Sequence, residues 1–126
     1  MEQTFTNVYE SKSWGNNNIA EYNGSSGEGS TLNYNKDTYV PFLKKFINDN
    51  NIKNIVDLGC GDFICGKIIY DDLDILYTGY DTYKKVVDYN SKNHSLPKYS
   101  FIIIFKGNIF LIASIIAFLI FSFASF

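Results

Sequence analysis

The stretch that most constrains the fold is residues 54–62, which read Asn-Ile-Val-Asp-Leu-Gly-Cys-Gly-Asp. Its Ile, Val and Leu side chains are typical of a short strand that is buried on both faces. Gly59 and Gly61 carry no Cβ, so the backbone after this strand can turn sharply and lie close to a ligand. Asp57 stands near the carboxyl end of the strand, where open α/β sheets bind their ligands. The stretch therefore predicts a strand, a tight turn and a helix, with a binding site at the turn.

A second acidic residue supports this interpretation. Residues 75–81 read Ile-Leu-Tyr-Thr-Gly-Tyr-Asp and predict a second strand that ends at Asp81. Asp81 follows Gly59 by 22 positions, close to the ~20 expected between the glycine turn and the ribose-binding acid of a βαβ nucleotide-binding unit. We expect Asp81 to accept hydrogen bonds from ribose hydroxyls, and Thr82 and Tyr83 to line the ribose or adenine edge. The alternative role of Asp81 is to cap the next helix, and the two roles are compatible.

The remaining elements alternate in the order of an α/β fold. Periodicity and turn signals predict helices and strands at 38–50, 53–58, 62–70, 75–81, 82–93 and 99–105. In the first helix one face carries an apolar stripe that we expect to pack in the core: Tyr39, Phe42, Leu43, Phe46 and Ile47. The prediction is a sheet of about three parallel strands with helices between them.

Residues 1–37 are polar and rich in Asn, Ser and Gly, and within them the Gly/Ser-rich stretch 22–31 predicts a loop with little intrinsic structure. Two interpretations remain open: a disordered linker, or a loop that covers the binding site. In the second, Trp14 and Tyr22 would anchor the loop on the domain. The backbone N–H groups of residues 27–30 would then be placed to receive a carboxylate.

The Val-Asp-Leu-Gly-Cys-Gly sequence of residues 56–61 resembles motif I of the class I, Rossmann-like methyltransferases that use S-adenosylmethionine (SAM). This resemblance implies that SAM is the cofactor. It places the backbone of Gly59, Cys60 and Gly61 against the methionine and ribose, and Asp57 at the loop or, through water, at the methionine ammonium. Phe63 departs from the pattern, since the family often has a third glycine there.

The resemblance covers residues 38–107 and implies only the amino-terminal half of such an enzyme, a truncated methyltransferase. The half that would carry the catalytic residues and bind the methyl acceptor is missing, so the resemblance assigns neither. Asn108 is the only polar candidate for the adenine contact. A nicotinamide-binding half-domain is a further alternative, which Ile64 disfavours because it stands where the last glycine of that fingerprint belongs.

Composition limits the other functions. The net charge is −2 and all 11 basic residues are Lys, which gives no general basic field for a nucleic acid. Two cysteines, Cys60 and Cys65, and one distant histidine are too few for a four-ligand zinc site, so we expect no metal. Free thiols and an N-terminus without signal-peptide features indicate a reducing, cytoplasmic location.

The apolar segment 108–126 has no charged residue. Its residues 109–126 would span roughly 27 Å as a helix, which meets the minimum for a membrane span. Lys98 and Lys106 before it fit a cytoplasmic side, and the chain would then be a small membrane-anchored protein without catalysis. The other interpretations are out-of-frame translation after about residue 105 and a buried strand–helix pair.

Overall fold

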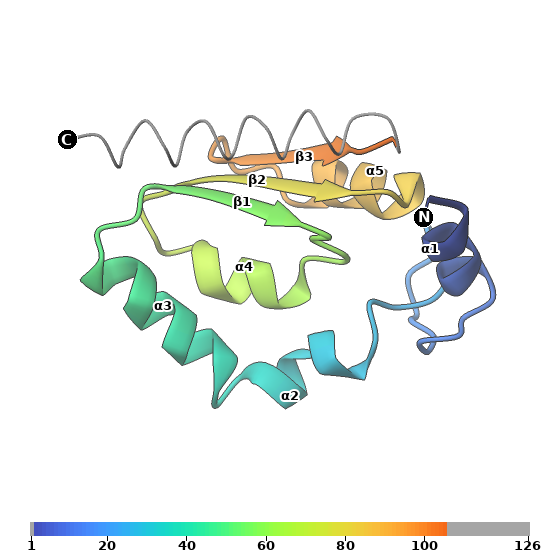
Figure 1. The fold of residues 1–126 in the computed structure, drawn as a ribbon, viewed down its shortest axis with the longest axis horizontal. Helices are drawn as coiled ribbons and strands as arrows, with labels where there is room; N and C mark the ends of the chain where they lie inside the picture. The colour runs from blue at the N-terminus through green and yellow to red at the C-terminus, as the bar shows by residue number, and fades with distance from the viewer. Residues whose placement is uncertain (1, 106–126) are drawn as a thin grey trace.

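The computed structural model describes residues 2–105, in which three parallel strands alternate with helices (Figure 1). The strands form one sheet in the order β1-β2-β3, with β1 at Asn54–Leu58, β2 at Leu76–Asp81 and β3 at Tyr99–Ile103. Parallel neighbours need a crossover connection, and a helix supplies it each time. The predicted α/β fold with about three parallel strands is confirmed.

Three helices lie close to their predicted positions: α3 at Tyr39–Asp49, α4 at Ile64–Tyr70 and α5 at Lys84–Asn93. Among residues 2–105 no helix is both long and apolar enough to cross a membrane. The predicted membrane span or out-of-frame tail at 109–126 lies outside the described residues, as does the adenine contact expected at Asn108.

The N-terminal segment 1–37 contains helices that were not predicted, although residues 22–27 of the Gly/Ser-rich stretch form neither helix nor strand. The segment contains helix α1 at Glu2–Glu10, a 3-10 turn η1 at Glu28–Ser30 and a short helix α2 at Leu32–Asn35. Helix α1 packs on the domain through Tyr9, which is buried and stacks on Tyr83 with ring centroids 4.5 Å apart. The N-terminal segment is therefore part of the folded domain.

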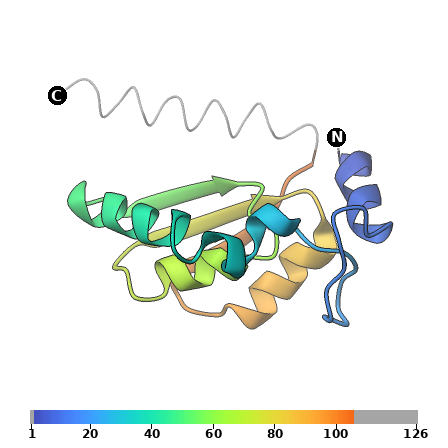
Figure 2. The same cartoon turned by 90° about the horizontal axis from the view of Figure 1, so that it is seen from below.

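Side chains of the strands alternate between two different environments. One face, which includes Tyr77 and Tyr99, packs against the helices and forms the core. Figure 2 shows α4 and α5 on the same side of the sheet. The opposite face carries four apolar side chains that are 43–62 % exposed: Val56, Leu58, Leu76 and Ile102. The described part of the chain thus buries one face of its sheet and leaves the other largely open.

The predicted core stripe of α3 is only half right. Val40 and Ile47 are buried and Leu43 is partly buried against the same cluster. The three aromatic residues of the predicted stripe are 46–65 % exposed: Tyr39, Phe42 and Phe46. Helix α3 packs beside α4 through Val40, Leu43 and Ile47. Val40 was not part of the predicted stripe, so the covered face is displaced from the predicted one as well as narrower.

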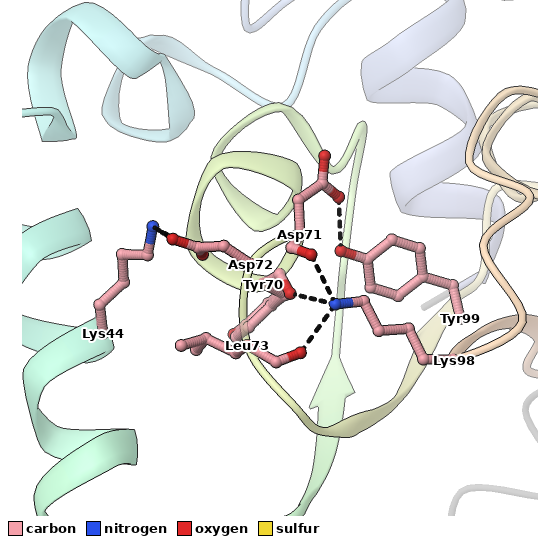
Figure 3. A network of polar contacts seen from close by, with 7 residues as sticks. All are labelled: Lys44, Tyr70, Asp71, Asp72, Leu73, Lys98 and Tyr99. Atoms are coloured by element: carbon pink, nitrogen blue, oxygen red, sulfur yellow. Dashed lines mark hydrogen bonds and ion pairs between the residues drawn. The ribbon is translucent and has the colours of Figure 1, made fainter.

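A polar network fixes the turn that follows α4 (Figure 3). The Lys98 ammonium donates to the carbonyl oxygens of Tyr70, Asp71 and Leu73 at 2.7–2.8 Å. Tyr70 is the last residue of α4, Asp71 is its C-cap and Leu73 lies in the turn beyond it, so the cation binds the carbonyls at the end of the helix and meets the negative end of its dipole. The Tyr99 hydroxyl adds a 2.6 Å bond to the Asp71 carboxylate. Lys98 therefore has a structural role inside the domain.

Candidate functional site

The turn after β1 has the backbone that its glycines predict. Gly59 and Gly61 have φ values of +88° and +54°, in the left-handed region that favours glycine. A Cβ on Gly59 would meet no atom within 4 Å, whereas a Cβ on Gly61 would lie 2.4 Å from Ser26 Oγ. The turn is thus open at Gly59 and covered at Gly61 by the Gly/Ser-rich loop.

Phe63 takes a glycine-like backbone conformation at the position where the methyltransferase motif often has its third glycine. Its φ is +57°, and its side chain is 2 % exposed among the rings of Tyr70, Tyr77 and Tyr99. A Cβ on Gly66 would lie 2.2 Å from the Phe63 ring, so Gly66 makes room for that ring. The residue that gives the turn its left-handed backbone, Phe63, therefore also fills the core with its side chain.

A cavity of about 200 Å³ adjoins the turn. Its wall is formed by the Gly/Ser-rich loop, the start of α3, the turn and α4, and it contains Asp57, Gly59, Cys60 and Gly61. Four of the six predicted binding residues thus come together. Asp81 and Thr82 are not among the lining residues, which are Ser26, Gly29, Ser30, Asn35, Tyr39, Asp57, Gly59, Cys60, Gly61, Asp62, Phe63, Ile64, Cys65, Gly66, Ile69 and Tyr70.

Asp57 is a partly buried carboxylate in this cavity. The Tyr77 hydroxyl donates a 2.8 Å hydrogen bond to its Oδ2. Burial raises the pKa of the Asp57 carboxyl above its usual range, and the Tyr77 bond opposes that shift. Among residues 2–105 it forms no ion pair.

Asp62 is the second acid of the cavity and is more deeply buried, at 7 % exposed. Its backbone N–H donates to Ser26 Oγ at 3.0 Å, and its carboxylate accepts from the Ser26 N–H at 3.4 Å. Burial again raises its pKa. The residues that line the cavity include no Lys and no His. Two carboxylates therefore share a half-enclosed space without a basic partner, and such a space favours a cationic ligand.

Asp81 sits on the other side of the glycine turn and is 9 % exposed. Its carboxylate accepts three backbone hydrogen bonds, from Gly61 N at 3.0 Å, Thr82 N at 2.7 Å and Tyr83 N at 3.0 Å. The last two bonds lie within the turn before α5, whose N-cap residue is Tyr83 without a side-chain cap, so the expected role of Asp81 as the cap of this helix is wrong. A carboxylate has about four acceptor positions, so one position remains for a further hydrogen-bond donor.

Helix α1 covers the side of the turn where Asp81 lies. The Tyr9 hydroxyl is 2.7 Å from Ser26 Oγ. Glu10 accepts hydrogen bonds from the Tyr83 hydroxyl at 2.8 Å and the Lys85 ammonium at 2.6 Å. The Lys85 contact is the main reason that the pKa of Glu10 is lowered to about 2. These contacts attach α1 to the start of α5.

The two aromatic anchors predicted for the N-terminal loop differ. Tyr22 is 2 % exposed and contacts Tyr9 and Tyr89, whereas Trp14 is 47 % exposed and packs on Phe5 of α1. Two of the four N–H groups expected to receive a carboxylate already donate within the loop, those of residues 27 and 30. The loop is therefore anchored, but with fewer free donors than expected.

Cys60 is held by close packing against β2. A Cβ on Gly79 would lie 2.9 Å from Cys60 Sγ, so this glycine makes room for the thiol. Burial raises the pKa of Cys60, which keeps it protonated and a poor nucleophile. Cys65 has a free thiol as well and donates to the Ser30 carbonyl at 3.2 Å. In the described range no group of three His, Cys, Asp or Glu is arranged to hold a metal.

Sequence reasoning missed three residues that shape the site. Tyr77 donates to Asp57, Ser26 contacts the turn, and the Asn90 amide donates to the Gly61 carbonyl at 2.7 Å. Asn90 is fully buried on the apolar face of α5. A polar residue on an apolar helix face is the signal that would have revealed this contact.

No family model matches this chain, and no curated protein sequence does. The structure supports an α/β fold with three parallel strands alternating with helices. The resemblance to SAM-dependent methyltransferases accordingly rests on the motif at 56–61 and on the position of Asp81.

Proposed function

We propose that this chain is a methyltransferase-like protein that binds SAM at the glycine turn. The observation that carries the proposal is the cavity beside the turn, which holds Asp57 and Asp62 and no basic side chain. SAM carries two positive charges, on its sulfonium and its ammonium, and one negative charge on its carboxylate, so its net charge is +1. At an effective dielectric constant near 20, a charge pair at 4 Å is worth about 4 kcal/mol before desolvation.

The size of the cavity limits which part of SAM it takes. Its volume of about 200 Å³ is below the roughly 300–1,000 Å³ of typical small-molecule pockets. The methionyl end fits such a space, with its ammonium near Asp57 and its chain over the open side of Gly59. The ribose would then lie across the turn at Asp81, under α1.

The residues have separate roles in this proposal. Asp57, oriented by Tyr77, holds the ammonium, and the open side of Gly59 accepts close approach of the ligand. Bound SAM would supply an activated methyl group to a nucleophilic acceptor. The roles of these residues are binding and orientation, which act by positioning the reacting groups.

The charge of the cavity also separates this proposal from the nicotinamide alternative. The pyrophosphate of a dinucleotide is doubly negative, and two unpaired carboxylates would repel it. Ile64, in place of a third glycine, gives the same preference from the sequence.

Calorimetric titration of the full chain tests the proposal. We expect SAM to bind and NAD not to bind, and we expect Asp57→Asn to weaken SAM binding at least tenfold. Asp74→Asn is the matched control, since it removes the same charge from a side chain that is 97 % exposed. Equal SAM affinity of the Asp57→Asn variant and the wild type, or preferential binding of NAD, would contradict the proposal.

A further inference from the structure

One apolar surface of the domain has no cover among the described residues. Three side chains form a row across the sheet at its carboxyl end, because Leu58 pairs with Tyr80 and Tyr80 with Ile102. Leu58 and Ile102 are 56 % and 43 % exposed. Val56 and Leu76 extend the same face toward the other end of the strands, at 47 % and 62 % exposed. We call these five residues the open face.

The described helices do not reach the open face. Helix α5 contacts β2 and β3, and α4 contributes Ile69 and Tyr70 to the core on the opposite side of the sheet. Figure 2 shows this one-sided arrangement. Thr78 and Ser100 lie on the same face, in the row that begins with Val56, so the apolar surface is concentrated at Leu58, Tyr80 and Ile102. An exposed apolar surface of this kind is a candidate interaction site in a soluble protein.

The chain itself supplies an apolar segment, which follows β3 in the sequence. Strand β3 ends at Ile103, beside the row that contains Ile102, and residues 109–126 carry no charge. As a helix they would measure about 27 Å and be about 10 Å across. Three strands of five or six residues offer a surface about 17–20 Å long and about 10 Å from the first strand axis to the third.

We propose that the open face is the docking surface for this chain's own residues 109–126. The arrangement buries two apolar surfaces against each other that are otherwise both exposed to water. It also completes a three-layer arrangement in which each face of the sheet is covered, as parallel sheets require. This inference does not depend on the proposed ligand, so the result of either experiment leaves the other proposal unchanged.

Limited chymotrypsin digestion of the full chain in detergent-free buffer tests the docking, with cleavage after Phe110, Phe118, Phe121 and Phe123 followed by mass spectrometry. We expect the double variant Leu58→Asp with Ile102→Asp to be cleaved in this segment at least tenfold faster than the wild type. Phe42→Asp with Ile68→Asp is the matched control, since it adds the same charge at exposed apolar positions of α3 and α4. Equal cleavage of the open-face variant and the wild type overturns the proposal.

Two further measurements distinguish other occupants. Wild-type protein that floats with phosphatidylcholine vesicles after a carbonate wash would place 109–126 in a membrane, and this overturns the proposal. Protection that disappears on dilution together with a dimer in sedimentation would assign the occupant to a second copy, and this also overturns it. If circular dichroism shows that the Asp variant is unfolded, Leu58→Ser with Ile102→Ser replaces it, with the same expected direction.

Discussion

Asp57 and Asp81 stand at the ends of neighbouring parallel strands, yet their surroundings are opposite. Asp57 lies in a cavity with one phenol donor, and its pKa is raised by burial. Asp81 is enclosed, and three backbone N–H groups converge on its carboxylate. The first is available to a ligand, and the second joins the glycine turn to the start of α5.

The difference shows that position at a strand end does not by itself assign a role to an acid. What decides is the number of hydrogen-bond donors that the fold already directs at the carboxylate. Asp57 keeps most of its acceptor capacity, so a change there should affect binding more than folding. A change at Asp81 should affect both.

The largest effect is expected for Asp81→Ala, which removes the acceptor of three N–H groups near the turn. We expect a loss of about 3 kcal/mol in the free energy of unfolding, because buried donors left unpaired cost roughly 1–3 kcal/mol each and some will find water. We also expect SAM affinity to fall at least tenfold. Urea unfolding and calorimetry measure the two effects.

The control for this variant is Asp88→Ala, which removes an exposed acid of α5 from an i,i+4 pair with Lys84. It should cost a few tenths of a kcal/mol. A folded Asp81→Ala variant with undiminished SAM affinity would leave Asp81 a purely structural residue and remove the ribose contact from the proposal.

An intermediate effect is expected from the two glycines of the turn. Gly59→Ala should cost about 1–2 kcal/mol, since its left-handed backbone disfavours a Cβ that otherwise meets open space. Gly61→Ala should cost about 2 kcal/mol more, because Ser26 Oγ must move and give up its bonds to Tyr9 and Asp62. Urea unfolding of both variants measures the difference, and equal costs would mean that the loop does not pack on Gly61 in solution.

The smallest effect is the pH dependence of Asp57. Its folded pKa lies above the ordinary value of 3.8, so its contribution to stability is present below that value and is lost as the pH rises through the folded pKa. Relative to Asp57→Asn, the wild type should therefore lose stability as the pH rises above about 4, by about 1.4 kcal/mol per unit of pKa difference. SAM affinity should change in the opposite sense and fall on acidification, because protonation removes the charge.

Unfolding curves and SAM titrations at a series of pH values check both signs. Asp74→Asn again serves as the control, since the contact with Lys53 lowers the pKa of Asp74. The contribution of Asp74 to stability is therefore lost as the pH falls, which is opposite to the direction for Asp57. A wild type that gains stability over Asp57→Asn on raising the pH would contradict the burial of Asp57.

The strands and helices after residue 38 were predictable because their signals are local. Helix α1 was missed although Phe5, Val8 and Tyr9 have helical spacing, since the polar composition around them favours a loop. The stripe of α3 was predicted too wide and without Val40, because the helix carries apolar residues around more than one face and periodicity does not tell which of them a neighbouring helix covers.

The part of the candidate site that lies in one stretch of sequence was predictable, and the contacts between distant residues were not. The motif places Asp57 and the glycines at one cavity, since all of them belong to one turn. The hydrogen bond from the Gly61 N–H to Asp81 joins residues 20 positions apart. The hydrogen bond from Tyr77 to Asp57 joins side chains of the neighbouring strands β2 and β1. Such contacts depend on strand register and side-chain orientation in the folded sheet, which the periodicity of the sequence does not predict.

The pairing of Phe63 with Gly66 has a consequence for how this turn can change. Replacing Phe63 by Gly would restore the third glycine of the motif but leave a ring-sized void, and large-to-small core changes of this kind cost about 3–5 kcal/mol. A side chain at Gly66 has no room until that ring is gone. The two positions are therefore epistatic, because the cost of a side chain at position 66 depends on whether residue 63 is Phe.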